Sequence, residues 1–270
     1  MPLVFACIAP HGYQALPEYV QDPDNAQTTR SSMSELGRRL EQLNPDTVIV
    51  LTPHGIRVEG TMCVSVSFRA SGTLKPDVSV DFEVDRELAA ELAGESERSG
   101  VPVARAIYGG SSGPHCNIPL DWGAVIPLRY LGHTYQPKPK VIVICPSRAL
   151  TREQMVAFGS AIARTAEASG KRVALIASAD HGHAHNAEGP YGYHPASAIF
   201  DQIMVEAVRS GELKERLLPI DPKLVEDAKP DSLWQVLILA GALDVKPMQA
   251  DFLSYEVPTY FGMLCAAYQP

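Results

Sequence analysis

Two histidines and one glutamate are the residues of this chain whose types and settings best suit chemistry. His11 and His54 each lie in a Pro-His-Gly block that follows a short apolar run, and Glu256 lies in Ser-Tyr-Glu-Val-Pro near the C-terminus. Two neutral imidazoles and one carboxylate can hold a divalent transition metal on one face and leave the opposite face open, which suits non-haem Fe(II) and oxygen chemistry. These residues therefore suggest a metal enzyme.

The repetition of the Pro-His-Gly block strengthens the metal hypothesis. A single histidine beside a turn is more often an ordinary polar loop residue than a ligand. Here the block occurs twice, after the apolar runs 3–9 and 48–51. In an open α/β sheet the ligand crevice lies outside the carboxyl ends of the strands. We therefore expect the two loops to converge at one edge of a sheet, whatever their separation in sequence.

The composition suits one soluble domain over residues 1–270 and argues against several other classes. The chain is 46% hydrophobic and 20% charged, enough for a large core. Its net charge of −8 offers no basic stripe, so we expect no nucleic-acid partner. No apolar run approaches the roughly 20 residues of a membrane span, and no signal peptide is recognisable. The five cysteines form no C-x-x-C pair and indicate a cytoplasmic protein.

Strands that alternate with helices predict the fold. Apolar, β-branched runs indicate buried strands, and amphipathic spacing or a capping-box pattern indicates the helices between them. We expect strands at 3–9, 47–51, 141–145 and 173–177, helices at 29–43 and after Thr151, and antiparallel members within 61–69, 78–84 and 252–267. Such alternation implies parallel pairing. The prediction is an α/β fold, a single-domain three-layer α/β/α sandwich with a mixed, largely parallel central sheet.

A histidine-rich segment, residues 180–185, follows the strand expected at 173–177. It contains His181, His183 and His185. An extended backbone would place all three on one face, whereas a turn at Gly182 would separate them. Its position directly after a central strand favours a catalytic loop.

Taken together, these blocks resemble the class III extradiol ring-cleaving dioxygenases of the catalytic B subunit type, also called the LigB superfamily. The resemblance runs from the first Pro-His-Gly block to the Ser-Tyr-Glu near the end. It includes residues 120–128, the spacing Asp180-x-x-His183, and Gly-Pro-Tyr-Gly-Tyr at 189–193. It implies a catechol-type small molecule and O2 as substrates, with the ring opened next to the diol. We also expect a homo-oligomer, a dimer or larger, without a membrane partner.

For the site, the resemblance implies Fe(II) held by His11, His54 and Glu256, although zinc or manganese would also bind such ligands in a crystal. Three protein ligands leave three of the six positions of Fe(II) for the catechol oxygens and dioxygen.

The same resemblance implies that His183 is the acid/base, since an imidazole with a pKa near 6.5 can both take and give a proton. Asp180 would orient it or stabilise its charge, with the histidines at 181 and 185 as alternatives to it. His115 and Tyr193 are candidates for substrate contacts.

Two other functions remain open from the sequence. Memo-type proteins share the fold and related histidines but are discussed as non-enzymatic interaction proteins, and they carry a cysteine at the position that matches Glu256. A zinc hydrolase also fits two histidines and one glutamate, although the chain has no H-E-x-x-H helix. The glutamate favours the iron dioxygenase.

Overall fold

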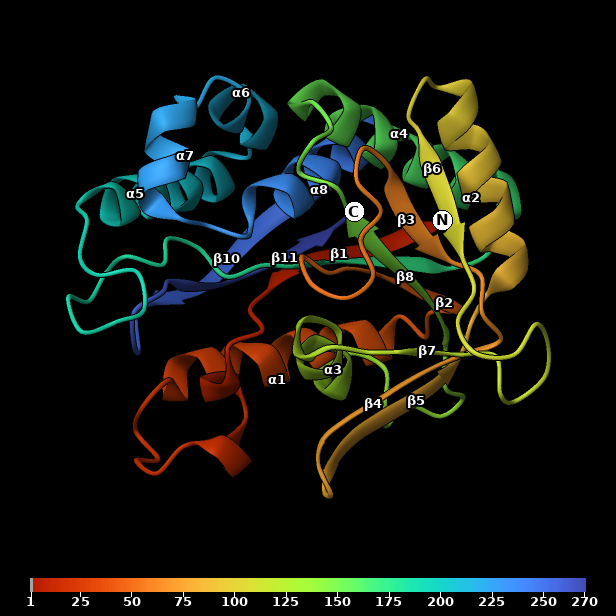
Figure 1. Ribbon diagram of the computed structural model, residues 1–270, viewed down its shortest axis with the longest axis horizontal. Coiled ribbons are helices and arrows are strands. Elements are labelled where there is room, and N and C mark those ends of the chain that lie inside the picture. Colours follow the sequence, from red (N-terminus) through yellow and green to blue (C-terminus); the bar gives the residue numbers. More distant parts are fainter. Residues whose placement is uncertain (1) are drawn as a thin grey trace.

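Four parallel strands form the centre of the main sheet, as the apolar runs predicted. A computed structural model, which describes residues 2–270, orders the eight strands of this sheet as β10-β11-β1-β9-β2-β8-β3-β6 (Figure 1). The four central strands, β1, β9, β2 and β8, are all parallel to one another. On either side of them, β11 pairs with β1 and β3 pairs with β8, both antiparallel. The strand bounds are β1 Leu3–Ala9, β2 Thr47–Leu51, β3 Met62–Ser65, β6 Val103–Ala106, β8 Lys140–Pro146, β9 Val173–Ser178, β10 Gln249–Glu256 and β11 Met263–Gln269.

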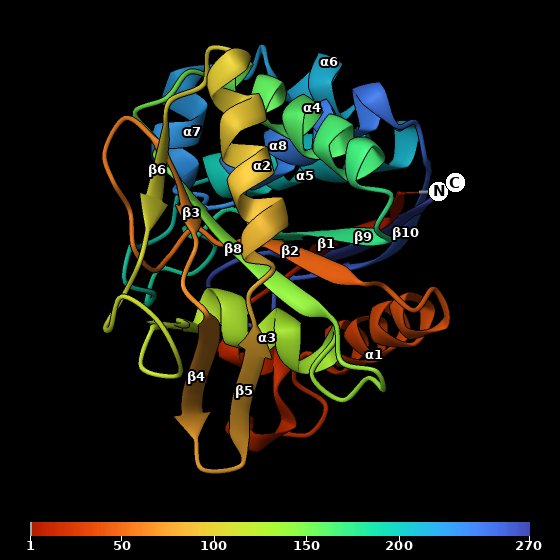
Figure 2. The same ribbon diagram turned by 90° about the vertical axis from the view of Figure 1, so that its right-hand side faces the viewer.

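Helices cover both faces of this sheet, which makes three layers. α1 and α3 lie on one face together with a small sheet of order β5-β4-β7, and the remaining α-helices lie on the other (Figures 1 and 2). The bounds are α1 Gln27–Gln42, α2 Arg86–Arg98, α3 Trp122–Tyr130, α4 Arg152–Ser169, α5 Ala196–Ser210, α6 Leu213–Leu217, α7 Pro222–Ala228, α8 Leu233–Val245, β4 Arg69–Lys75, β5 Val78–Glu83 and β7 Asn117–Pro119, with short 3-10 helices at Tyr13–Ala15 and Pro17–Tyr19. The predicted α/β fold with a mixed, largely parallel sheet is confirmed.

The alternation of side chains along each central strand fills two separate cores. In β2, Ile49 packs into the cluster that contains Phe158 of α4, and Val50 packs into the cluster that contains Met33 of α1. Because both faces are buried, the strand reads as a continuous apolar run. The capping box predicted at Thr151 is present at the start of α4.

One segment with an antiparallel pattern divides differently from the prediction. The sequence analysis expected residues 61–69 as one strand. In the structure, β3 ends at Ser65 and β4 begins at Arg69. β3 pairs with β8 in the main sheet, whereas β4 pairs with β5 and β7 in the small sheet. Alternation describes both strands equally well, and only the partner strands decide which sheet each one joins. Among the described residues, no helix is both long and apolar enough to cross a bilayer.

Candidate active site

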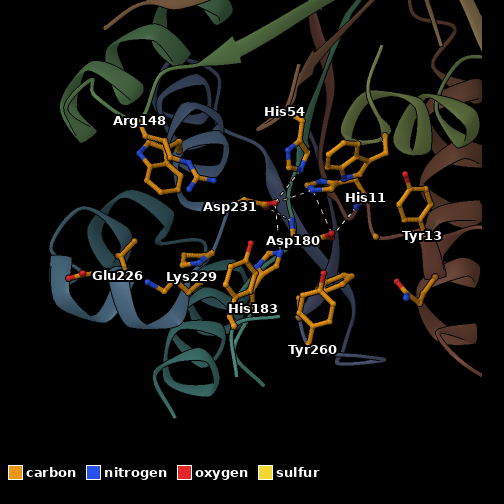
Figure 3. A pocket seen from close by; sticks show the side chains of 18 of the residues that line it. His11, Tyr13, His54, Arg148, Asp180, His183, Glu226, Lys229, Asp231 and Tyr260 are labelled. Atoms are coloured by element: carbon orange, nitrogen blue, oxygen red, sulfur yellow. Dashed lines mark hydrogen bonds and ion pairs between the residues drawn. The ribbon is translucent and has the colours of Figure 1, made fainter. Parts of the chain in front are cut away.

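Three side chains from distant parts of the chain meet at the carboxyl ends of the central strands. His11 follows β1, His54 follows β2, and Asp231 lies in the connection between α7 and α8. The Nε2 atoms of His11 and His54 lie 3.2 and 3.6 Å from Oδ2 of Asp231, and one donor atom of each residue lies within 4.8 Å of the other two. Figure 3 shows the three side chains pointing toward one another. We call them the His-His-Asp group.

Glu256 does not join the two histidines, although the sequence analysis expected it there. Its Oε1 accepts hydrogen bonds from the backbone nitrogen and Oγ1 of Thr29 at 2.6 and 2.5 Å, in the first turn of α1. β10, which ends at Glu256, is the outermost strand, and β11 separates it from β1. At roughly 4.8 Å per strand, Glu256 lies roughly 10 Å to the side of His11. The carboxylate beside the histidines belongs to Asp231, which the sequence analysis missed.

Hydrogen bonds orient the ring of His11. Its Nδ1 lies 2.9 Å from Oγ of Ser178, and the Ser178 hydroxyl donates to the carbonyl oxygen of Gly123. Because that hydroxyl has a single hydrogen, Ser178 accepts from Nδ1–H of His11. In the neutral ring, Nε2 therefore carries no hydrogen, and its lone pair faces the other two side chains. A histidine that binds a metal through Nε2 needs this tautomer.

The start of α3 packs directly against His54. The ring of Trp122, the first residue of α3, lies 4.2 Å from the His54 ring between centroids. Gly123 permits this approach, because a Cβ at this position would lie 2.6 Å from Oγ1 of Thr52 and 3.0 Å from Cδ2 of His54. Burial, followed by the charge of His11, lowers the pKa of His54 to about 4. The His54 ring is therefore neutral at pH 7, as a ligand must be.

Two buried carboxylates make the group attractive to positive charge. Burial alone lowers the pKa of His11, but the charges of Asp180 and Asp231 and the hydrogen bond to Asp231 outweigh burial and raise this pKa to about 9. Burial by itself would raise the pKa of the Asp231 carboxyl. The charge of His11 and its hydrogen bond outweigh the effect of burial and lower the pKa of Asp231 to about 2. A divalent cation would take over the role of the His11 proton. The donor set and its charge thus fit a metal ion.

Asp180 links the members of the group through its own backbone and side chain. Its Oδ1 accepts a hydrogen bond of 3.0 Å from the backbone nitrogen of His11, and its backbone nitrogen donates one of 3.0 Å to Oδ1 of Asp231. Its Oδ2 lies 3.6 Å from Nε2 of His11. Burial raises the pKa of the Asp180 carboxyl. The structure thus brings Asp180 to the site, where it holds His11 and Asp231 in place.

His183 lies beside the His-His-Asp group with one ring nitrogen free. Its Nδ1 lies 2.5 Å from the carbonyl oxygen of His181, which can only accept, so Nδ1 carries the hydrogen. Its Nε2 lies 3.9 Å from Oδ2 of Asp231, and its ring stacks on Phe261 with centroids 5.2 Å apart. The free Nε2 can accept a proton from a bound molecule.

The two histidines next to His183 face elsewhere. The ring of His181 is fully buried, and its Nδ1 lies 3.0 Å from Oγ of Ser232. Nε2 of His185 lies 2.8 Å from Oδ2 of Asp201. Neither histidine lines the cavity described next. The three rings therefore face different surroundings and do not form one strip.

A cavity of about 710 Å³ opens over the His-His-Asp group. This volume falls within the range of small-molecule sites. Its walls combine aromatic rings with a few charged groups, and its lining residues are His11, Gly12, Tyr13, Gln14, His54, Trp122, Arg148, Asp180, His183, Tyr191, Pro222, Val225, Glu226, Lys229, Pro230, Asp231, Trp234, Tyr260 and Phe261. The sequence analysis missed the aromatic walls, because their residues come from loops and helix ends without a shared pattern.

The two predicted substrate contacts do not line this cavity. His115 is exposed in the loop between β6 and β7, and Tyr193 is 63% exposed. Tyr191, two residues earlier, lies on the cavity wall instead. The His115 loop also contains a G-x-S-x-G pattern at 109–113, but this segment joins two strands rather than a strand and a helix, so it is not a nucleophile elbow.

Known proteins are similar to this chain over most of its length. The family described as "Catalytic LigB subunit of aromatic ring-opening dioxygenase" matches residues 6–264. Protein CA_C1420 of Clostridium acetobutylicum is 26% identical over 254 residues, which cover 92% of this chain and 54% of that protein. The 2-aminophenol 1,6-dioxygenase beta subunit of a Pseudomonas species is 26% identical over 215 residues, which cover 70% of this chain and 66% of that protein.

The fold also has a solved counterpart. The crystal structure of the uncharacterized protein JW3007 from Escherichia coli K12 matches with a TM-score of 0.62 and 14% identity, over 98% of this chain and 99% of that one. This similarity concerns the fold, whereas the family match spans the residues of the site. The chain belongs to the LigB family of catalytic subunits of aromatic ring-opening dioxygenases.

Proposed function

We propose that this protein is a non-haem Fe(II) dioxygenase that cleaves a catechol-type ring next to the diol, with the metal held by His11, His54 and Asp231. The observation that carries the proposal is the His-His-Asp group at the floor of the cavity. Two imidazoles and one carboxylate with an open face form the ligand set of many non-haem Fe(II) oxygenases. The family match to ring-opening dioxygenases supports the same chemistry. Assembly as a homo-oligomer stays a prediction.

Bound Fe(II) would supply open coordination positions and redox chemistry with dioxygen. The protein's own contribution begins with orientation of the substrate. Trp122 packs on the His54 ring, Phe261 packs on the His183 ring, and both aromatic residues line the cavity. A planar ring between them would present its hydroxyl oxygens to the group. Such positioning lowers the barrier because the reacting groups are already aligned.

Proton transfer is the second contribution of the protein. His183 holds its hydrogen on Nδ1 and turns Nε2 toward the cavity, so it can accept the proton of a catechol hydroxyl. The same nitrogen can later return that proton to an oxygen of the opening ring. Asp180 holds the backbone of His11 and contacts Asp231 through its own backbone, so it positions the ligands.

A catechol panel with oxygen-uptake measurement tests this function. The protein is loaded anaerobically with Fe(II), mixed with each catechol in air, and monitored for oxygen and for near-ultraviolet absorbance of a ring-opened product. We expect one oxygen per catechol and no hydrogen peroxide, because both oxygen atoms enter the product. The zinc-loaded protein should be silent, since zinc has no redox chemistry. Intact catechols across the panel would favour a non-enzymatic Memo-like role, and hydrolysis with zinc would favour a hydrolase.

A further inference from the structure

The loop between β9 and α5 that carries His183 has an acceptor for each of five successive backbone N–H groups. We call residues 181–185 the His183 loop. Buried N–H groups need such partners, and here all five acceptors belong to other parts of the chain. They are, in order from residue 181 to residue 185, the carbonyl oxygen of Gly262, Oδ1 of Asp201, the carbonyl oxygen of Ala228, Oγ of Ser197 and the carbonyl oxygen of Tyr260. The surroundings therefore hold the loop, and two of its acceptors are side chains of α5.

One peptide group links Asp201 of α5 to the ring of His183. The N–H of Gly182 donates to Oδ1 of Asp201 at 2.7 Å. The carbonyl oxygen of the same peptide group belongs to His181 and accepts from Nδ1–H of His183 at 2.5 Å. A peptide group is planar, so its N–H and C=O turn together, and an acceptor on the N–H strengthens the C=O as an acceptor. Asp201 therefore acts on the bond that orients the His183 ring.

The same carboxylate holds the far end of the His183 loop. Oδ2 of Asp201 accepts hydrogen bonds from the hydroxyl of Tyr255 in β10 at 2.7 Å and from Nε2 of His185 at 2.8 Å. Asp201 is 1% exposed, so water does not compete for these bonds. Gly262 leaves room for the carboxylate, because a Cβ at this position would overlap Oδ2 of Asp201. One buried side chain thus ties two elements to the residues before and after His183.

Ser197 supports the loop from the same face of α5. It precedes Asp201 by four residues, so the two side chains are neighbours on the helix. Its Oγ accepts from the backbone nitrogen of Ala184 at 2.9 Å. Neither Ser197 nor Asp201 lines the cavity. Both can therefore act on a bound molecule only through the His183 loop.

We propose that Asp201 is a positioning residue that holds the loop on both sides of His183, so that Nε2 of His183 faces the cavity. This inference rests on the proposed function, in which His183 moves the proton. Proton transfer requires an approach of about 2.6–3.2 Å, and a misplacement of about 1 Å can cost about a hundredfold in rate. Loss of the Asp201 carboxylate should therefore lower kcat and leave the binding of metal and of catechol unchanged.

Steady-state kinetics of Asp201→Asn tests the proposal. Asparagine keeps the size of the side chain, but only one of its two terminal atoms can accept a hydrogen bond. With the Fe(II) protein and the catechol that the wild type cleaves fastest, we expect kcat to fall about ten- to a hundredfold, with KM and iron content within about twofold of wild type. Asp201→Ser, which shortens the side chain, is the second variant and should show the same split between kcat and KM.

Asp85→Asn is the matched control for the loss of a buried carboxylate. Asp85 is 3% exposed and accepts hydrogen bonds from three residues, as Asp201 does; they are Thr47, Leu88 and Lys171. Thr47 begins β2, whereas His54 follows the end of β2, so Asp85 lies at the opposite edge of the sheet from the site. Both variants should lose stability, but Asp85→Asn should keep the kcat of the wild type.

Nuclear magnetic resonance follows the His183 ring without turnover. Protein with isotope-labelled histidine is loaded with Zn(II), and long-range proton–nitrogen spectra are recorded, with the His183 signals identified by their absence in His183→Phe. We expect the wild type and Asp85→Asn to show a single tautomer with the hydrogen on Nδ1. In Asp201→Asn the signals of the two ring nitrogens should shift toward a common value, because both tautomers become populated.

Three results for Asp201→Asn would each overturn the positioning role: the kcat of the wild type, a raised KM or lost iron in place of a lowered kcat, or an unchanged tautomer of His183. An equal loss of kcat in Asp85→Asn would also overturn it, because the effect would then follow from lost stability. If the wild type cleaves no catechol but its His183 tautomer depends on Asp201, the proposed function fails alone and the positioning of the ring stands.

Discussion

Nε2 of His11 lies 3.2 Å from Oδ2 of Asp231, although 220 residues separate them in the chain. The contact joins the loop after the first strand to the connection before α8. Asp231 also accepts the backbone N–H of Asp180, so three loops meet at one carboxylate.

Asp231→Asn should lose the metal, whereas Glu256→Gln should keep it. Asparagine preserves the size of the side chain and the acceptor for the backbone of Asp180, but removes the charge that attracts a divalent cation. Loss of groups that merely support ligands typically weakens metal binding 10- to 100-fold, so loss of a ligand should cost at least about a hundredfold. Metal content after dialysis, measured by mass spectrometry, checks both variants. Retention in Asp231→Asn together with loss in Glu256→Gln would restore the sequence-based ligand set.

Glu256→Gln should instead weaken the fold at the start of α1. The Glu256 carboxylate accepts from both the backbone nitrogen and Oγ1 of Thr29, and no side chain caps this helix at Ala26. Loss of a helix cap typically costs about 0.5–2 kcal/mol of unfolding free energy. Urea denaturation of the wild type, Glu256→Gln, Thr29→Val and the double variant would measure the coupling. An unchanged free energy of unfolding in Glu256→Gln would contradict the cap. Additive effects of the two single changes would show that the Thr29 hydroxyl is not coupled to the Glu256 carboxylate.

His183→Phe should keep its iron and turn over at least about a hundredfold more slowly, the usual cost of losing a positioned acid/base. His115→Phe is the matched control, because His115 is exposed and does not line the cavity. It should leave kcat within about twofold of wild type. Single-turnover rates with iron content measured on the same samples separate chemistry from metal loss. Iron loss in His183→Phe would make this residue a ligand.

Asp85 should make stability depend on pH in the acid range. Burial raises the pKa of this carboxyl, but hydrogen bonds from Thr47 and Lys171 outweigh it and lower the pKa below 3.8. A lowered folded-state pKa stabilises the protein above the unfolded-state value, and this contribution is lost as pH falls through the folded-state pKa. Asp85→Asn should thus be less stable than wild type at neutral pH.

Urea denaturation at a series of pH values would check this. The difference in unfolding free energy between wild type and Asp85→Asn should be level from about pH 5 to 7 and shrink below about pH 4. Glu97→Gln is a suitable control, because Glu97 forms its ion pair with Arg105 on the protein surface, where such pairs contribute little. A difference that stays constant down to acid unfolding would mean that Asp85 acts only by packing.

The local sequence was sufficient for the central strands and for part of the site. The runs 3–9 and 47–51 coincide with β1 and β2, because strands buried on both faces must be apolar throughout. His11 and His54 converge because β1 and β2 are parallel and only β9 lies between them. Two polar loops at the ends of such strands meet at one edge of the sheet. Asp180 and His183 reach the site for the same reason, since they follow β9.

Only the tertiary structure decided which carboxylate completes the group. Glu256 does lie at the end of a strand that runs in the same direction as β1, as its local pattern indicated, but β10 is two strands away. Asp231 follows no strand and reaches the histidines because α7 and α8 bring their connection over the sheet edge. Periodicity records which face of an element is buried, but not the order of strands in a sheet, because every order buries the same apolar faces. Strand order and helix connections therefore determined the ligand set.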